Sequence, residues 1–528
     1  MRQIEAGELE ALWQRAHRHA ERKQWEQAKA CFNSILAYRP DDPAVLVQLS
    51  YICSLEGHYR AARAAALRAG AANVPISPQV VNQLLPRLRT FNEAEVFHRL
   101  LGRLGPPERM PIPLLLGCAA QLSYFNEQER ALALLDEAKR ADPDYPATLM
   151  SRGQVLTYMA RFEEAEQDLL HSLRRAPELA QTYWLLSRLR TQTPADNHVA
   201  QIREQLARQG RPAADEAMLG YALHKELDDL KDYVEAARAL DRACRAKRSM
   251  LDYRSEDSRR LVDALLASAS PPQAGDAPAA SVAARSIHTP LFIVGMHRSG
   301  TTLLEQLLDG HDQVKGVGEL YDFTSQMRYA TDHHCRGVID ATIVERARDV
   351  DFSAVGRGYL EKMEWRLGPE PYFTDKLPSN FLNIGFICRA LPQAKILHMV
   401  RDPVETCFSN LRELFSEANP YSYDQLELAD FYKQYRRLMA HWHRQWPGRI
   451  LDVDYAELTR DPETVLRRIC AFCGLDFQPQ MLALTERKRG VATASAVQVR
   501  QGIVARERPK WAPYEAYLQP LIQALRDD

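Results

Sequence analysis

This sequence contains no run of about 18 consecutive apolar residues, the length that a membrane-spanning helix needs, and we expect no membrane span. The first residues, Met1 to Glu5, include an early acid and begin no apolar stretch of the kind found in secretory leaders. Neither sign of charge is in excess, since 68 Lys and Arg stand against 69 Asp and Glu. This balance argues against a nucleic-acid-binding protein. The nine Cys are scattered and odd in number, which favours reduced thiols in a cytoplasm over a disulfide framework.

A helical repeat occupies the first part of the chain, from Leu9 to about Arg190. One marker recurs there: a small residue, a bulky residue four positions later, a small or apolar residue three further on, and often a Pro. The first copy comprises Ala28, Phe32, Ile35 and Pro40. Later copies centre on small residues at spacings of 34, 32, 37 and 34, namely Ala62, Ala94, Ala131 and Ala165.

A period of about 34 residues with small residues at the helix crossings is typical of tetratricopeptide repeats (TPRs). Small side chains let two helices approach closely, and Pro ends the second helix before the next repeat begins. The pattern is degraded between Arg190 and Pro212, and a further helical pair follows over Leu219 to Arg248. Stacked pairs form a superhelix with a concave groove, so we expect this solenoid to hold a protein or peptide partner.

The chain changes character after an Ala-, Pro- and Ser-rich stretch. We assign residues 1–265 to the helical repeats, 266–289 to a linker and 290–528 to a second domain. Short apolar runs alternate with helical stretches in that second domain, at 291–294, 395–400 and 450–455. Alternating strands and helices predict an α/β domain with a parallel sheet.

A phosphate-binding loop joins the first of these strands to a helix. The residues from Gly295 to Thr302 have the spacing of the P-loop motif, with Thr301 where nucleotide hydrolases carry Lys. Backbone N–H groups of such a loop curl around an anion at a helix N-terminus. Because the Lys that reaches the β- and γ-phosphates is missing, ordinary ATP or GTP hydrolysis is not expected. Arg298 and the hydroxyls of Ser299, Thr301 and Thr302 surround the anion instead.

These residues resemble a known family. The segment PLFIVGMHRSGTTLLEQLLDGHDQVKGVGEL resembles the 5′-phosphosulfate loop of sulfotransferases that use 3′-phosphoadenosine 5′-phosphosulfate (PAPS). It is most similar to bacterial TPR-linked sulfotransferases and more distantly to tyrosylprotein sulfotransferases. The family loop reads G-x-P-R-S-G-T-T, and His297 stands here in place of the Pro. Three later segments also match, in the family's order: KILHMVRDPVETCFSN, VDYAELTRDPETVLRRICAFCGL and TASAVQVRQGIVARERPKWAPYEAYL.

The resemblance implies a catalytic set and a donor-binding set. Glu319 matches the family's catalytic acid and becomes the base for the acceptor. Lys376 and Arg298 take the bridging-oxygen role, and Asp375, beside Lys376, only orients it. Contacts to PAPS are implied for Arg298, Ser299, Gly300, Thr301, Thr302, Arg401, Ser409, Tyr455, Ser495 and Lys510. Within this set a guanidinium and a hydroxyl, those of Arg401 and Ser409, suit a 3′-phosphate, the group that separates PAPS from ATP-like nucleotides.

The function implied is sulfuryl transfer from PAPS to an acceptor hydroxyl or amine, such as a tyrosine of a protein or peptide held by the repeats. PAPS is then a co-substrate and no metal is expected, since no His and Cys spacing suits one. Two other readings stay open: an interaction scaffold that binds nucleotide without turnover, and a nucleotide kinase. The acceptor itself, whether peptide tyrosine, sugar or lipid, and the oligomeric state are not determined by the sequence.

Overall fold

The computed structural model describes residues 6–268, 288–415, 417–484, 503 and 508–526. They form two compact units, Met1–Ala141 with Thr324–Arg336, and Asp142–Phe323 with Gly337–Asp528. The predicted division at residues 265 and 290 stays a prediction. Most of the predicted linker, 269–287, lies outside the described residues.

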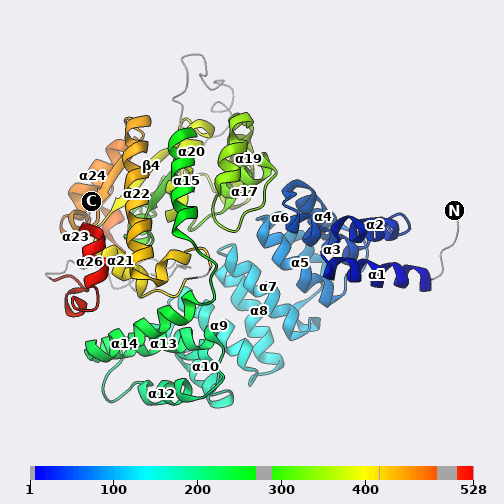
Figure 1. Cartoon of the computed structure of the whole chain (residues 1–528), viewed down its shortest axis with the longest axis horizontal. Coiled ribbons are helices and arrows are strands. Elements are labelled where there is room, and N and C mark those ends of the chain that lie inside the picture. The colour runs from blue at the N-terminus through cyan, green and yellow to red at the C-terminus, as the bar shows by residue number, and fades with distance from the viewer. Residues whose placement is uncertain (1–5, 269–287, 416, 485–502, 504–507, 527–528) are drawn as a thin grey trace. The chain divides into compact units, whose positions relative to one another are not determined.

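The N-terminal part is helical, as predicted, and is built from antiparallel helix pairs (Figure 1). Its helices are α1 (Ala6–Glu21), α2 (Trp25–Leu36), α3 (Pro43–Leu55), α4 (Tyr59–Ala71), α5 (Pro78–Thr90), α6 (Ala94–Arg103), α7 (Ile112–Tyr124), α8 (Gln128–Ala141), α9 (Pro146–Tyr158), α10 (Phe162–Arg175), α11 (Ala180–Leu189), α12 (Val199–Ala207), α13 (Ala213–Asp229), α14 (Tyr233–Arg248) and α15 (Ser255–Ser268).

One type of turn recurs between the two helices of a pair. Its tight residue has a positive φ, and this residue is Lys23, Gly57, Asn92, Asn126, Ala160 or Lys231. Five positions later lies a buried residue whose backbone N–H donates to the carbonyl of the residue four positions before it, at the start of the second helix. This residue is Ala28, Ala62, Phe97, Ala131, Ala165 or Ala236.

The position of this turn in the third repeat shows that the register expected from the sequence is wrong there. The sequence marker there was Ala94, but the hydrogen-bond pattern places Phe97 at the equivalent position. The first five copies are then spaced by 34, 35, 34 and 34 residues. The interval from Ala165 to Ala236 fits two repeats, of which α11 and α12 form the degraded first. A bulky Phe at a position normally held by Ala hid the copy from the sequence pattern.

The second part is an α/β domain around five parallel strands, as predicted. The strands are β1 (Thr289–Gly295), β2 (Val314–Gly316), β3 (Tyr372–Asp375), β4 (Lys395–Val400) and β5 (Ile450–Asp454), in the order β2-β3-β1-β4-β5. Phe292 of the central strand β1 lies opposite Asp375 of β3 on one side and opposite Ile396 of β4 on the other. The sequence predicted β1, β4 and β5, whereas β2 and β3, at three and four residues, are too short to show a periodicity.

Helices cover the sheet. They are α16 (Thr301–Leu308), α17 (Asp322–Thr331), α18 (Ala341–Arg346), α19 (Phe352–Met363), α20 (Ile384–Ala390), α21 (Pro403–Leu411), α22 (Gln425–Gln445), α23 (Tyr455–Arg460), α24 (Pro462–Cys473) and α26 (Gln519–Arg526). Short 3₁₀ turns lie at 107–109, 347–349, 364–366, 378–383, 420–423, 479–482 and 512–514. Leu291, Ile293, Leu304 and Ile469 belong to the fully buried core between the sheet, α16 and α24.

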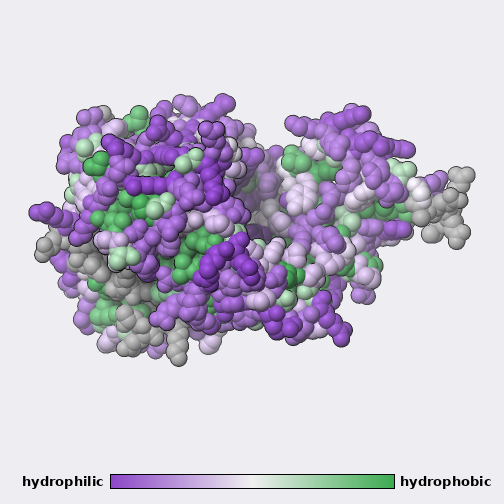
Figure 2. Space-filling model, turned by 90° about the horizontal axis from the view of Figure 1, so that it is seen from below, coloured by the Kyte–Doolittle hydropathy of each residue, from purple (hydrophilic) through white to green (hydrophobic). Residues whose placement is uncertain are grey.

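Helix α15 packs along α22 (Figure 1), with ion pairs Arg259–Asp430 and Asp263–Arg437. All nine Cys are free thiols, and seven are buried. Hydrophilic residues predominate on the face in Figure 2, where the hydrophobic ones form separate patches. Within the described ranges, no helix combines the length and the apolar character needed to cross a bilayer.

Candidate active site

The candidate residues lie where the five parallel strands end. The phosphate loop follows β1, Glu319 lies just beyond β2, Lys376 follows β3, Arg401 follows β4 and Tyr455 follows β5. In the strand order, β2 and β3 lie on one side of β1, and β4 and β5 lie on the other. The carboxyl ends of β1 and β4 therefore flank the switch point at which ligands bind in open α/β sheets. Parallel strands thus bring together residues that are far apart in the chain.

Glycine is required at both ends of the phosphate loop. A Cβ on Gly295 (φ +148°) would lie 2.7 Å from the carbonyl oxygen of Met399, and one on Gly300 (φ +111°) would lie 2.4 Å from the Tyr455 ring. The loop is therefore pressed against β4 and against Tyr455, and α16 begins directly after it at Thr301. Among the described residues, the buried Oγ of Ser299 has no hydrogen-bond partner, which fits a hydroxyl that can bond to an anion.

His297, which replaces the family's Pro, is held by packing. Its carbonyl accepts a hydrogen bond of 2.7 Å from Asn410 Nδ2, and its ring lies edge-on to Phe415 at 5.6 Å. Burial, followed by the charges of Lys376 and Arg298, lowers the pKa of His297 to about 3. The ring is therefore neutral at physiological pH, and tertiary contacts supply the rigidity that a Pro would have given.

Arg298 lies in a buried, cation-rich place. Its side chain is 8% exposed, its Nε donates to Ser409 Oγ at 3.4 Å, and its Nη1 lies 3.8 Å from Glu413 Oε2. Burial lowers the pKa of Arg298; Glu413 opposes this, while Arg188, Arg401 and Arg412 add to it. Several guanidinium groups around one loop create a positive potential that an anionic ligand would relieve.

Arg401 joins this cluster from the end of β4. Its Nη1 donates to the carbonyl oxygen of Arg298 at 3.2 Å, and its guanidinium lies 4.3 Å from the centre of the Tyr455 ring. It also forms an ion pair with Glu405, whose other oxygen accepts the backbone N–H of Lys510 at 2.9 Å. The structure therefore brings Arg401, Ser409 and Tyr455 to the phosphate loop, and it bonds the backbone of Lys510 to Glu405, the partner of Arg401.

Glu319 and Lys376 form an ion pair, with 2.6 Å between Oε1 and Nζ. The Lys376 side chain is fully buried, whereas the Glu319 side chain is 36% exposed. An exposed carboxylate beside a buried ammonium suits a pair in which one group meets the solvent-borne reactant and the other lies within the site. Two of the three predicted catalytic residues thus lie side by side, although 57 residues separate them in sequence.

Glu305, on α16, was missed by the sequence analysis. Its buried Oε1 accepts the backbone N–H of Gly318 at 2.7 Å and the hydroxyl of Thr374 at 3.1 Å. The amide of Lys376 in turn donates to the carbonyl of Gly318 at 3.1 Å. These bonds hold Glu319 and Lys376 next to each other. Because its partners, Gly318 beyond β2 and Thr374 on β3, lie 13 and 69 residues away in the sequence, no local sequence signal marks Glu305.

Asp375 serves the core, which differs from its expected role beside Lys376. Tyr359 donates to its Oδ2 at 2.9 Å and Asn380 to its Oδ1 at 3.3 Å. Burial raises the pKa of Asp375 well above its usual range. Ser495, predicted to contact the donor, lies outside the described residues.

One group of described residues has ligand atoms close enough for a metal ion: His398, His443 and Asp452. Asp452 Oδ1 lies 2.7 Å from Nδ1 of His398 and 2.8 Å from Nε2 of His443. These are hydrogen-bond lengths, so a carboxylate shared between two imidazoles accounts for the cluster. His398 also contacts the Tyr435 hydroxyl.

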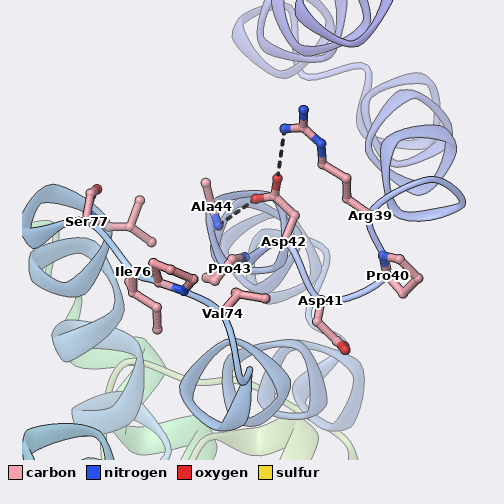
Figure 3. Close-up of a pocket in the computed structure, with 11 residues that line it drawn as sticks. Arg39, Pro40, Asp41, Asp42, Pro43, Ala44, Val74, Ile76 and Ser77 are labelled. Carbon is pink, nitrogen blue, oxygen red and sulfur yellow. Dashed lines mark hydrogen bonds and ion pairs between the residues drawn. The ribbon is translucent and has the colours of Figure 1, made fainter. Parts of the chain in front are cut away.

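A separate hollow of about 560 Å³ lies among the first repeats (Figure 3). The turn before α3 forms one side and the segment before α5 the other, and Asp42 accepts a hydrogen bond from the amide of Ala44. The lining is Arg39, Pro40, Asp41, Asp42, Pro43, Ala44, Val74, Pro75, Ile76, Ser77 and Val80. Its apolar and proline side chains with a charged rim are typical of a surface that contacts another molecule.

Comparison with known proteins identifies the α/β part. Residues 290–479 match the model of the sulfotransferase family. The match lies wholly within the α/β part of the chain. Over 412 residues the chain is 28% identical to an uncharacterized protein of Aquifex aeolicus (strain VF5), a match that takes in 76% of this chain and 53% of the relative. The chain thus spans about half the length of that relative.

The sulfotransferase domain also has relatives with named activities. A putative protein-tyrosine sulfotransferase of Caenorhabditis briggsae is 28% identical over 192 residues, covering 36% of this chain and 68% of that protein. A solved sulfotransferase domain from the curacin biosynthetic pathway matches with 17% identity and a TM-score of 0.28, over 45% of this chain and 98% of that domain.

Proposed function

We propose that this protein transfers a sulfuryl group from PAPS to an acceptor hydroxyl. The observation that carries the proposal is the cation-rich loop at the β1–β4 switch point, with the Glu319–Lys376 pair at the same edge of the sheet. The match of residues 290–479 to the sulfotransferase family supports it. A buried Ser299 hydroxyl with no partner among the described residues and a buried Arg298 among other cations both favour binding of an anionic donor.

The residues divide into holding and reacting groups. The amides and hydroxyls of residues 299–302, with Arg298, would hold the phosphosulfate, and Arg401 with Ser409 the 3′-phosphate. Tyr455 and Lys510 complete the donor site in this proposal, as does Ser495. The donor supplies the sulfuryl group, and transfer leaves 3′-phosphoadenosine 5′-phosphate (PAP).

Glu319 accepts the proton of the acceptor hydroxyl as its oxygen forms the new bond to sulfur. The bond between sulfur and the bridging oxygen breaks at the same time, by analogy with in-line phosphoryl transfer. Lys376 and Arg298 stabilise the negative charge that develops on that oxygen. The Lys376–Glu319 contact keeps the two groups in place before the acceptor enters.

The acceptor in this proposal is a tyrosine of a protein or peptide held by the helical repeats. The named activity of the C. briggsae relative supports the tyrosine, and the hollow between the first repeats supports a bound partner. We propose a cytoplasmic location, in line with the nine free thiols.

Calorimetric titration with PAP and with AMP tests the donor. Binding of PAP at least tenfold tighter than AMP supports a site for a 3′-phosphate, whereas equal binding would contradict it. Labelled PAPS with a tyrosine peptide and its Phe-substituted twin then tests the acceptor. Label on the tyrosine peptide alone supports phenolic transfer, and turnover of PAPS with neither peptide labelled points to another acceptor class.

A further inference from the structure

Two of the helices, α11 and α13, contact the segment at the end of α21 that lies beside the phosphate loop. Three consecutive residues, 411–413, are bound to α11 and α13. Tyr221 donates its hydroxyl to the carbonyl of Leu411 at 3.0 Å. Arg412 pairs with Asp228 at 2.6 Å, and its Nε donates to Nε2 of His224 at 3.0 Å. Glu413 forms an ion pair with both guanidinium nitrogens of Arg188.

The same segment reaches the phosphate loop. Ser409 accepts from Arg298 and Asn410 donates to the carbonyl of His297, both at the end of α21. Glu413 lies 3.8 Å from Arg298. A continuous set of contacts therefore runs from α11 and α13 through residues 409–413 to the loop that would hold the donor.

Glu413 is shared unequally between its two cations. Arg188 engages both of its oxygens within hydrogen-bond distance, whereas the Arg298 contact, at 3.8 Å, is longer than a hydrogen bond. The Glu413 side chain is only 9% exposed, so water screens these charges poorly. While Arg188 holds both oxygens of the carboxylate, Glu413 pairs with Arg298 only at the longer distance of 3.8 Å.

A second helical residue lies near the reacting groups. Burial raises the pKa of Tyr158, at the end of α9, and the charges of Arg188, Glu319 and Glu413 act on its phenol.

We propose that Arg188 is a positioning residue through which the helical repeats control the donor site. By holding Glu413, it limits how closely this carboxylate pairs with Arg298. The inference rests on the proposed function, because its main readout is PAP binding. It makes the helical repeats part of the catalytic unit as well as a docking platform.

The test compares variants of the full chain by calorimetric titration with PAP. Arg188→Ala should weaken PAP binding tenfold or more, because Glu413 then pairs with Arg298 and competes with the anion. Glu413→Gln should bind PAP at least as tightly as the unaltered protein. The double variant Arg188→Ala/Glu413→Gln should recover to within threefold of it, which a general loss of packing would not allow.

Arg248→Ala is the matched control. Arg248 also joins the helical part to the α/β part, through a two-bond pair with Glu427 on α22 at 2.8 Å, but without contact to the phosphate loop. Its PAP affinity should stay within twofold. Unchanged binding in Arg188→Ala, equal losses in both single Arg variants, or a double variant as weak as Arg188→Ala would overturn the inference.

Two further measurements distinguish a failure of the positioning role from a misfolded variant and from a failure of the proposed function. Should Arg188→Ala fail to fold, Arg188→Lys, which retains the charge but not the two-bond geometry, should show a smaller loss that Glu413→Gln again relieves. If the unaltered protein binds no PAP, the proposed function is wrong. Hydrogen exchange of the amides of residues 295–302 then decides: Arg188→Ala should alter it and Arg248→Ala should not. Unchanged exchange in both would overturn the positioning role.

Discussion

At the scale of single residues, the site is a set of charges that need specific partners. Arg401 combines a contact to the loop carbonyl, a stack on Tyr455 and an ion pair with Glu405. Its guanidinium is therefore pre-oriented, and a bound phosphate gains from a cation that has already lost its side-chain freedom.

Arg401→Ala should weaken PAP binding by roughly 2–5 kcal/mol, because truncating one partner of a desolvated charge pair leaves the other uncompensated. AMP binding should change little, since AMP lacks the 3′-phosphate. Titration with both ligands measures the difference. Arg467→Ala is the control, because it removes an exposed ion pair with Glu463 on α24. Equal losses for PAP and AMP would show a disturbed loop instead of a lost phosphate contact.

Glu319→Gln should reduce transfer by roughly 10²–10⁴-fold while PAP binding stays near normal, since the amide keeps the shape but not the basicity. Lys376→Ala should also reduce turnover, through an uncompensated bridging oxygen. Single-turnover rates measure both effects, and Glu361→Gln, on an exposed part of α19, should leave them unchanged. Full transfer by Glu319→Gln would remove Glu319 from the base role.

At the scale of elements, the helix pairs depend on close approach. A Cβ on Gly220 of α13 would lie 2.8 Å from the Cβ and 3.1 Å from the Cα of Ala243 on α14. Ala243 is fully buried, and backbone cannot move aside as a flexible side chain does.

Gly220→Ala should therefore destabilise the protein by about 1–3 kcal/mol, the usual cost of overpacking. Gly102→Ala is the matched control, because Gly102 lies in α6 with no atom near the added methyl. That variant should be neutral, or more stable by up to about 1 kcal/mol. Thermal unfolding midpoints compare the two, and an unaffected Gly220→Ala would mean that α13 and α14 can separate without cost.

The contact between α13 and Arg412 should make the stability of the protein depend on pH. Burial, then the charge of Arg412, lowers the pKa of His224 to about 4, while Asp228 opposes the shift and Lys225 adds to it. The folded state therefore resists a proton that the unfolded chain binds below about pH 6.5. This contribution to stability is full above pH 6.5 and declines as the pH falls toward 4.

For this group alone, stability at pH 5 should be about 2 kcal/mol lower than at pH 8. His224→Gln should flatten that part of the pH dependence, whereas His19→Gln, at a more exposed position, should not. Denaturant unfolding between pH 8 and pH 5 measures both. An identical pH slope in His224→Gln and the unaltered protein would rule out His224 as the source.

At the scale of the whole molecule, helices from residue 142 onward belong to the same compact unit as the sheet. Ion pairs and hydrogen bonds link them, among them Asp228–Arg412, Arg248–Glu427 and Asp228–Tyr514. The helices from residue 142 onward and the sheet therefore contribute to each other's stability.

We predict that a fragment of residues 1–265 retains helical circular dichroism, as a repeat array does. A fragment of residues 288–528 should unfold at a lower temperature than the full chain, because it leaves Arg412 and Glu413 without their helical partners. Adding the first fragment in trans should raise its midpoint. A fragment 288–528 as stable as the full chain would mean that the helices contribute nothing to the sheet domain.

The sequence alone determined what local patterns encode. The 34-residue period follows from helix packing, and the glycine-rich turn after a buried strand follows from the need for backbone to approach an anion. Arg298, Lys376 and Arg401 could be proposed because the segments that contain them resemble those of a known family. The register of the third repeat could not, because Phe97 stands where an Ala was expected.

Only the tertiary structure decided the partners of these residues. Glu305 holds the Glu319 segment, Asp375 belongs to the core, and Glu413 lies between Arg188 and Arg298. Such contacts join positions up to 225 residues apart, so no spacing records them. They depend on burial, which strengthens a charge pair and penalises an unpaired one, and burial exists only once the sheet and the repeats have packed.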